Sequence, residues 1–340
     1  MLRGRMVLLK VPAGIRMTLV AGVLAAMPAL SAAGTNCETL YVLTEDASYV
    51  EGCFPPCECP LTEATRFRGT FTLGPDTIDY AIISQDVNHL YWIATIDSKE
   101  VEVTGSGVYR RSVGPSPPAH ALDLDLTVDG GEPQHFSSGW LPLASDDGSI
   151  TIPVSIHGQT CHDTLIVVDA SPVPPDAVLE YRLATDSAYL KGCFDPCDCP
   201  LEEPRPLEGT LSLVEILNHG TYVEYAVPYA AFVAPAVQPG GNDVTLDGFG
   251  LYTLIQGFAG PAHILDLRLR SDDGPVEEFG NELFNTDPTF PGEFAVVVDT
   301  NDQVCLDTVL SLHAIWSGPI VFHDDFECGD TADWSNSPGP

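Results

Sequence analysis

A dense cysteine motif occurs twice in this chain and indicates an internal duplication. Residues 52–61 read GCFPPCECPL and residues 192–201 read GCFDPCDCPL, and the flanking sequences match at the same offset of 140 residues. At an offset of 143, PAHALDLDLTVDGG from residue 118 matches PAHILDLRLRSDDG from residue 261. Each copy spans about 135 residues, the size of a single domain rather than of a solenoid unit that needs neighbours to bury its core. The sequence therefore predicts two tandem homologous domains.

Within each copy, apolar residues alternate with polar ones. Residues 122–128 read LDLDLTV, residues 150–156 read ITIPVSI and residues 265–269 read LDLRL. This period of two is typical of strands with one buried face. Asp-Gly pairs punctuate the chain at hairpin spacing, and no stretch shows a convincing apolar helical period. We therefore expect an all-β protein in which each copy is an antiparallel β-sandwich or a closed barrel.

The ends and the joint of the two copies define the expected boundaries. Four basic residues precede an apolar run that ends in small residues at 31–33, which predicts a signal peptide. Pro28 interrupts the run and it falls short of the roughly 20 residues of a membrane span, so an uncleaved anchor is disfavoured. The predicted organisation is a signal peptide at 1–33, a β domain at 34–171, a proline-rich linker at 172–177, a second β domain at 178–316 and a tail at 317–340.

The charge of the chain limits its partners. Without residues 1–33, 10 Lys and Arg face 48 Asp and Glu, a net charge of 10 − 48 = −38. Such a surface repels nucleic acid and anionic membranes and favours cations or basic partners. We expect no nucleic-acid partner, no integral membrane protein after cleavage, and a secreted protein in the extracellular space or at the cell surface.

Each copy keeps four cysteines, an even number that favours two disulfides per domain in an exported protein. The sequence allows three connectivities in each domain, of which a Cys57–Cys59 bridge is the least favoured because its ring is small and strained. A four-cysteine zinc site is the alternative, because C-x₃-C lies within the range of zinc-ligand spacings. The cysteines concerned are Cys53, Cys57, Cys59 and Cys161 in the first copy and Cys193, Cys197, Cys199 and Cys305 in the second.

Cys37 and Cys328 lie outside the repeat, near opposite ends of the chain. If both are oxidised, they join each other within one chain or join neighbouring molecules head to tail. A head-to-tail linkage is a heterologous contact that builds an open fibre rather than a closed dimer. The remaining alternative is that Cys328 is free or capped in the tail.

The repeat carries little that indicates catalysis. The chain has no G-x-S-x-G, H-E-x-x-H, P-loop or C-x-x-C-H motif. One histidine position recurs, as His120 and His263 within P-A-H, and we expect its ring to satisfy a local backbone group rather than to act as a ligand or base. His135 and His162 have no histidine counterpart, so a metal site that they shared with His120 would be private to the first copy.

The recurring aspartates leave two interpretations open. Asp163 and Asp307 share a C-x-D-T motif, and acidic turns lie at residues 146–148 and 272–274. Calcium binding would suit these carboxylates, and so would turn capping. We favour turns, and we predict no cofactor, with calcium as the alternative.

The repeat, with its C-F-x-P-C-x-C, G-T-F-x-L, G-x-G-x-Y, L-D-L and C-x-D-T elements, resembles one found in uncharacterised secreted proteins of environmental bacteria. The resemblance covers most of residues 40–316 and implies no activity. Residues 320–335, IVFHDDFECGDTADWS, are similar to a short F-E-S-G-D-T-S-x-W-S motif that ends many exported bacterial proteins, which implies a role in sorting or attachment. Cys328 stands where that motif has serine.

The repeat is duplicated, but no catalytic motif is duplicated with it. This favours a non-catalytic secreted or cell-surface protein with a structural or adhesive role. Such a protein would self-associate or bind a cell-surface or polysaccharide partner. The alternative is a secreted carbohydrate-binding module or polysaccharide hydrolase. In that case Tyr91, Trp92 and Trp140 would form aromatic platforms for sugars, and acidic pairs would act as acid and base. These aromatics have no clear counterparts in the second copy.

Overall fold

The computed structural model describes residues 38–318, except 97–98, 113–116, 144–147, 238–239, 258–259, 273 and 282–289. The predicted signal peptide, residues 319–340 of the predicted tail, Cys37 and Cys328 lie outside the described residues. The described chain is nearly all β-strand, apart from turns and a short 3₁₀-helix at Pro175–Ala177. None of its helical segments is long and apolar enough to cross a membrane.

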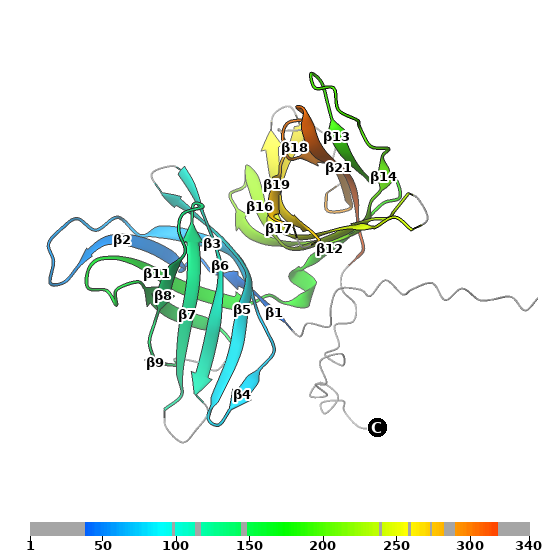
Figure 1. The fold of residues 1–340 in the computed structure, drawn as a ribbon. Helices are drawn as coiled ribbons and strands as arrows, with labels where there is room; N and C mark the ends of the chain where they lie inside the picture. Colours follow the sequence, from blue (N-terminus) through cyan, green and yellow to red (C-terminus); the bar gives the residue numbers. More distant parts are fainter. Residues whose placement is uncertain are drawn as a thin grey trace, which may run out of the picture. The chain divides into compact units, whose positions relative to one another are not determined.

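The first copy forms one antiparallel sheet that closes on itself (Figure 1). Strand pairings run round a ring of β1, β3, β5, β6, β7, β8, β10 and β11, and β11 pairs again with β1. Neighbours in the ring follow chain order, so the copy is an up-and-down barrel. The strands are β1 Thr39–Leu43, β2 Ser48–Phe54, β3 Thr65–Leu73, β4 Thr77–Asp79, β5 Ile82–Ile96, β6 Lys99–Ser112, β7 Ala119–Val128, β8 Gln134–Ser137, β9 Leu141–Pro142, β10 Ile150–Ser155 and β11 Cys161–Pro172.

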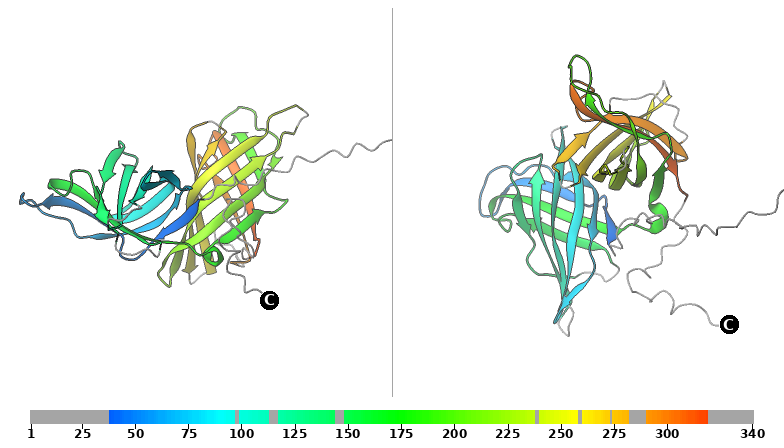
Figure 2. Two further views of the ribbon diagram at one scale, coloured as in Figure 1. Left: turned by 90° about the horizontal axis from the view of Figure 1, so that it is seen from below. Right: turned by 45° about the vertical axis from the view of Figure 1, so that its right-hand side comes forward.

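The second copy repeats this strand order as a second curled sheet (Figure 2). Its ring runs β12, β15, β16, β17, β18, β19, β20 and β21, with a bridge between Gly280 and Asp299 joining β19 to β20. The strands are β12 Leu179–Leu183, β13 Ala188–Cys193, β14 Arg205–Pro206, β15 Glu208–Asn218, β16 Tyr222–Ala234, β17 Val244–Gly257, β18 Gly260–Ser271, β19 Val276–Phe279, β20 Glu293–Asp299 and β21 Leu306–Trp316. The prediction of an all-β, disulfide-stapled protein is confirmed, and of the two architectures the structure has the barrel.

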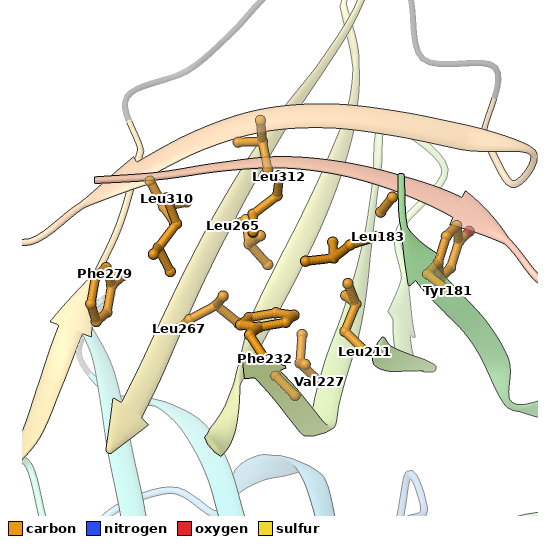
Figure 3. Close-up of a cluster of buried hydrophobic side chains, with 14 of the residues drawn as sticks. Tyr181, Leu183, Leu211, Val227, Phe232, Leu265, Leu267, Phe279, Leu310 and Leu312 are labelled. Carbon is orange, nitrogen blue, oxygen red and sulfur yellow. The ribbon is translucent and has the colours of Figure 1, made fainter. Parts of the chain in front are cut away.

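The alternation seen in the sequence sorts the side chains between the barrel interior and its outside. In β7 the leucines are at most 3% exposed, whereas Asp123 and Asp125 between them face outward. In the second barrel, aromatic and leucine side chains from most strands of the ring meet at the centre (Figure 3). Burial of these apolar surfaces is the main favourable contribution to folding. Both interiors are therefore packed with side chains.

Glycines of the G-T-F-x-L and related segments allow a strand to approach its neighbour closely. Gly69 adopts φ +139°, and a Cβ there would lie 2.1 Å from the carbonyl oxygen of Tyr91. Gly209 adopts φ +149° and would place a Cβ 2.1 Å from the carbonyl oxygen of Ala231. Both the positive φ and the contact exclude other residues, which explains why glycine stands at this position in both copies.

Candidate functional site

The cysteines of each copy form two disulfides. Cys53 pairs with Cys59 and Cys57 with Cys161 in the first barrel, and Cys193 pairs with Cys199 and Cys197 with Cys305 in the second. The first bridge of each pair closes the loop on itself, and the second ties that loop to the start of β11 or β21. The disfavoured Cys57–Cys59 bridge does not form. Disulfide sulfurs cannot act as thiolate ligands, so this pairing argues against the zinc alternative.

The C-x-D-T aspartates cap the turns next to these disulfides. Asp163 is 1% exposed, and its carboxylate accepts backbone N–H bonds from Ile156, His157, Gln159 and Thr164 at 2.7–3.1 Å. Asp307 is 2% exposed and accepts bonds from the backbone of Thr300, Gln303 and Thr308 and from the Thr300 hydroxyl. Both carboxylates accept hydrogen bonds within their own turns, as the capping interpretation expects.

The other acidic turns fall partly outside the described residues. Residues 144–147 and Asp273 lie there, whereas Asp272 accepts hydrogen bonds from the backbone and the hydroxyl of Thr245. In the described part of the chain, no three or more His, Cys, Asp or Glu side chains are grouped so that they could hold a metal ion.

The P-A-H histidines lie inside the two barrels. His120 is 3% exposed and its Nδ1 lies 3.1 Å from the hydroxyl of Tyr109, and His263 is fully buried with its Nδ1 3.2 Å from the hydroxyl of Tyr252. Burial lowers the pKa of both rings below the ordinary value, so both are neutral at pH 7. The same Tyr–His pair thus occupies the same place in both cores, out of reach of a substrate.

The other histidines do not join them. His135 is exposed on β8 and pairs with Asp125 at 2.9 Å, and His162 is exposed in β11 beside the cysteine loop. The hypothesis of a metal site shared by His120, His135 and His162 is therefore wrong, because His120 points into the core while the other two face solvent.

Two of the three predicted aromatic platforms are also buried. Trp92 is 1% exposed inside the first barrel and Tyr91 is 4% exposed, so neither offers a free ring face to a sugar. In the strand register, Gly69 lies opposite Trp92 and the equivalent Gly209 lies opposite Phe232. Trp92 therefore has an aromatic counterpart in the second copy, which the sequences around the two residues did not indicate. Trp140 is 49% exposed and remains accessible.

A cavity of about 430 Å³ opens on the outside of β17–β19, and motif reasoning did not find it. Its lining from the second barrel includes Gly250, Asp266, Leu267, Arg268, Glu278, Phe279, Gly280, Asn281, Asp299, Thr300, Asn301 and Asp302, and Tyr91 and Glu102 of the first barrel complete it. Both barrels therefore contribute side chains to this cavity. In the sequence, this site is indicated by the aspartate of the L-D-L motif, which the alternation of the strand places on its outer face.

Charges in the cavity are unevenly matched. Arg268 forms ion pairs with Glu102 and, at 3.2 Å, with Glu278, and its guanidinium lies over the Tyr91 ring. Asp266 makes no hydrogen bond or ion pair with a described residue. Burial, followed by the negative charge of Glu102, raises the pKa of Asp266 to about 6. The cavity is thus rich in carboxylates, and one of them holds its proton more strongly than usual.

The equivalent residue in the first barrel is held differently. Asp123 accepts hydrogen bonds from Ser137 at 2.5 Å and from Arg110, and it forms an ion pair with Arg110. Burial acts to raise the pKa of Asp123, but these bonds outweigh it and leave that pKa below the ordinary value. The same motif position therefore gives a firmly ionised carboxylate in one copy and a proton-holding one in the other.

These features define an all-β protein with two disulfide-stapled up-and-down barrels. In comparisons with known proteins, no family model, no curated protein and no solved structure matched this chain significantly.

Proposed function

We propose that this chain is a non-catalytic protein of the extracellular space or the cell surface with a structural or adhesive role. The main support is that the shared cysteines, C-x-D-T aspartates and P-A-H histidines all serve the scaffold. The eight cysteines form disulfides, Asp163 and Asp307 cap turns, and His120 and His263 lie in the cores. Four disulfides suit an oxidising compartment. The scaffold is duplicated, but these shared residues give neither copy an accessible reactive group. This favours a role in which the barrels offer binding surfaces over a catalytic role.

The proposal is tested with the purified, oxidised chain on insoluble cellulose, chitin and xylan. Co-sedimentation and the release of reducing ends are measured in the same samples. We expect no reducing ends from any of the three, and retention on one of them would support an adhesive role. Release of reducing ends that rises with protein concentration would overturn the non-catalytic proposal.

The cavity favours the second candidate, a carbohydrate-active protein. A glycoside hydrolase needs one carboxylic acid with a raised pKa and a second, ionised carboxylate nearby. Asp266 has the first property, and Glu278 and Glu102 are further carboxylates that line the same cavity. In this alternative Asp266 would protonate the leaving oxygen. Because Arg268 engages both glutamates, neither is free as the structure stands.

One pair of variants separates the two candidates. If Asp266 is a catalytic acid, Asp266→Asn abolishes any release of reducing ends and Asp123→Asn, its counterpart in the first barrel, does not. If the protein is structural or adhesive, neither variant changes retention on the polysaccharide that the unmodified chain binds.

A further inference from the structure

The cysteine loops that follow β2 and β13 lie outside the two barrel cores (Figure 1). All residues of 55–64 in the first copy and of 195–204 in the second are exposed, and none of them belongs to the buried apolar cluster of its barrel. Each loop nevertheless contains a disulfide between cysteines six residues apart. So short a crosslink removes little entropy from the unfolded chain, so its main effect is to fix the shape of an exposed loop.

A glycine in each strand lets the end of the loop lie directly against it. A Cβ at Gly52 would lie 2.4 Å from the carbonyl oxygen of Pro60, and a Cβ at Gly192 would lie 2.7 Å from that of Pro200. Both glycines adopt φ values, +140° and +149°, that other residues rarely take. The last residues of each loop therefore run along β2 or β13 as a short additional strand.

Leu61 and Leu201 place their main-chain groups on the outer edge of these short strands. Leu61 lies opposite Gly52 in an antiparallel bridge, and the residues on either side of the pair make its two hydrogen bonds, at 3.4 and 2.8 Å. Leu201 lies opposite Gly192 in the same way, with bonds of 3.4 and 2.9 Å. In such a non-hydrogen-bonded pair, the N–H and C=O of the leucine point away from the strand that it faces.

No described strand pairs with this outer edge in either copy. β5 pairs with β3 from Phe67 onward, and β16 pairs with β15 from Glu208 onward, so both neighbouring strands end before they reach the loops. The side chains of Leu61 and Leu201 are 49% and 50% exposed. An exposed edge of this kind is a template for an added strand, whose apolar side chains could pack on the leucine.

The charge around both edges limits which segment can add there. Residues 51–63 contain three acidic and no basic side chains, a net charge of 0 − 3 = −3, and residues 191–203 contain four acidic and one basic, a net charge of 1 − 4 = −3. Two copies of this chain would bring like charges together at these edges, which disfavours self-pairing. A basic segment would instead bring opposite charges together.

We propose that Leu61 and Leu201 mark two equivalent sites at which an extended, basic segment of another protein adds as a strand. The N–H and C=O of each leucine bond to the backbone of the segment, and the nearby carboxylates attract its basic side chains. Two sites on one chain allow bivalent attachment, which raises avidity where both segments belong to one surface. This inference names a partner class for the adhesive role proposed above and rests on that role.

A short peptide of alternating lysine and valine, added to the purified, oxidised full chain at physiological ionic strength, tests the proposal. We expect titration calorimetry to give two peptides per chain, and hydrogen exchange at the amides of Leu61 and Leu201 to slow in the complex. The same peptide methylated on its backbone nitrogens keeps its charge but cannot donate hydrogen bonds, so it should bind about tenfold more weakly. Equal binding of the two peptides, or no binding of either, would contradict the proposal.

Proline substitution removes the two edges one at a time, because it deletes an N–H that the fold does not use and blocks the approach of a strand. We expect Leu61→Pro and Leu201→Pro each to bind one peptide and the double variant to bind none. Tyr80→Ser, at a residue of the first barrel that is 99% exposed, is the control and should bind two. Two bound peptides in the double variant would overturn the proposal. If a variant does not fold, the methylated peptide decides the question with the unmodified chain.

Other outcomes separate this proposal from the non-catalytic role and from self-association. Release of reducing ends by a chain that still binds two peptides would overturn the non-catalytic role and leave both edges as peptide sites. Absence of peptide binding by a chain that is retained on a polysaccharide would overturn only the strand-addition proposal. If the chain without peptide forms dimers in which the amides of Leu61 and Leu201 are protected, the occupant is a second copy and the proposal of a basic partner is wrong.

Discussion

At the residue scale, one motif position has opposite electrostatic properties in the two barrels. The pKa of Asp266 is raised to about 6, mainly by burial, so folding favours its protonated form. Stability tied to this group is present at acid pH and is lost as pH rises from about 4 through about 6. The pKa of Asp123 is lowered, so its contribution is present at neutral pH and is lost as pH falls below the ordinary aspartate range.

We therefore expect opposite effects from the same substitution. At pH 7.5, Asp266→Asn raises the melting temperature because it removes a carboxylate whose charge is disfavoured by burial and by Glu102, and Asp123→Asn lowers it because it removes the partner of Arg110. The effect of Asp266→Asn shrinks as pH falls from 6 to 4. Differential scanning calorimetry across this range measures both variants, and a change of the same sign in the two would show that the local environments do not act as described.

At the scale of elements, sequence periodicity located the strands but not their closure. The alternation of residues 122–128 and 265–269 reports a local property, one buried face, and so it predicted β7 and β18 directly. Barrel closure, the burial of Tyr91 and the pairing of the cysteines depend on neighbours distant in sequence, which no local pattern encodes. No sequence pattern predicts the cavity as a whole, because its walls come from both copies whereas the repeated motifs lie within each copy.

The turn between β10 and β11 offers a test of the capping role. Asp163→Ala would leave four buried or half-buried backbone N–H groups without their acceptor. Unsatisfied buried donors cost about 1 kcal/mol or more each, so we expect a loss of about 3 kcal/mol in the free energy of unfolding. Chemical denaturation with the disulfides intact measures it. Asp125→Ala, at an exposed ion pair with His135, is the control and should change stability by less than about 1 kcal/mol. Equal losses would argue against the buried cap.

At the scale of the whole molecule, each barrel contributes an arginine to a glutamate of the other. Arg68 in β3 forms an ion pair with Glu224 in β16, and both residues are 5% exposed. Arg268 in β18 pairs with Glu102 in β6. Outward-facing apolar residues of both barrels pack beside them, including Tyr91, Ile93 and Leu251.

Removal of one partner of the buried pair should uncouple the barrels. Arg68→Gln leaves Glu224 buried without its cation, which costs about 3 to 5 kcal/mol. We expect calorimetry to resolve two separate unfolding transitions in this variant, one for each barrel. In the unmodified chain the two transitions should lie closer together or merge. Arg66→Gln, at an exposed pair with Glu45, is the control and should have little effect. If Arg68→Gln unfolds like the unmodified chain, the pair does not hold the barrels together.

The central claim is that the duplicated cysteine motif staples a loop to the closing strand of each of two barrels. Peptide mapping of the natively oxidised protein without reductant, with elemental analysis of the same sample, tests it most directly. We predict linked peptides that join Cys53 to Cys59, Cys57 to Cys161, Cys193 to Cys199 and Cys197 to Cys305, with no zinc. A different pairing, free thiols among these eight cysteines or stoichiometric zinc would contradict it.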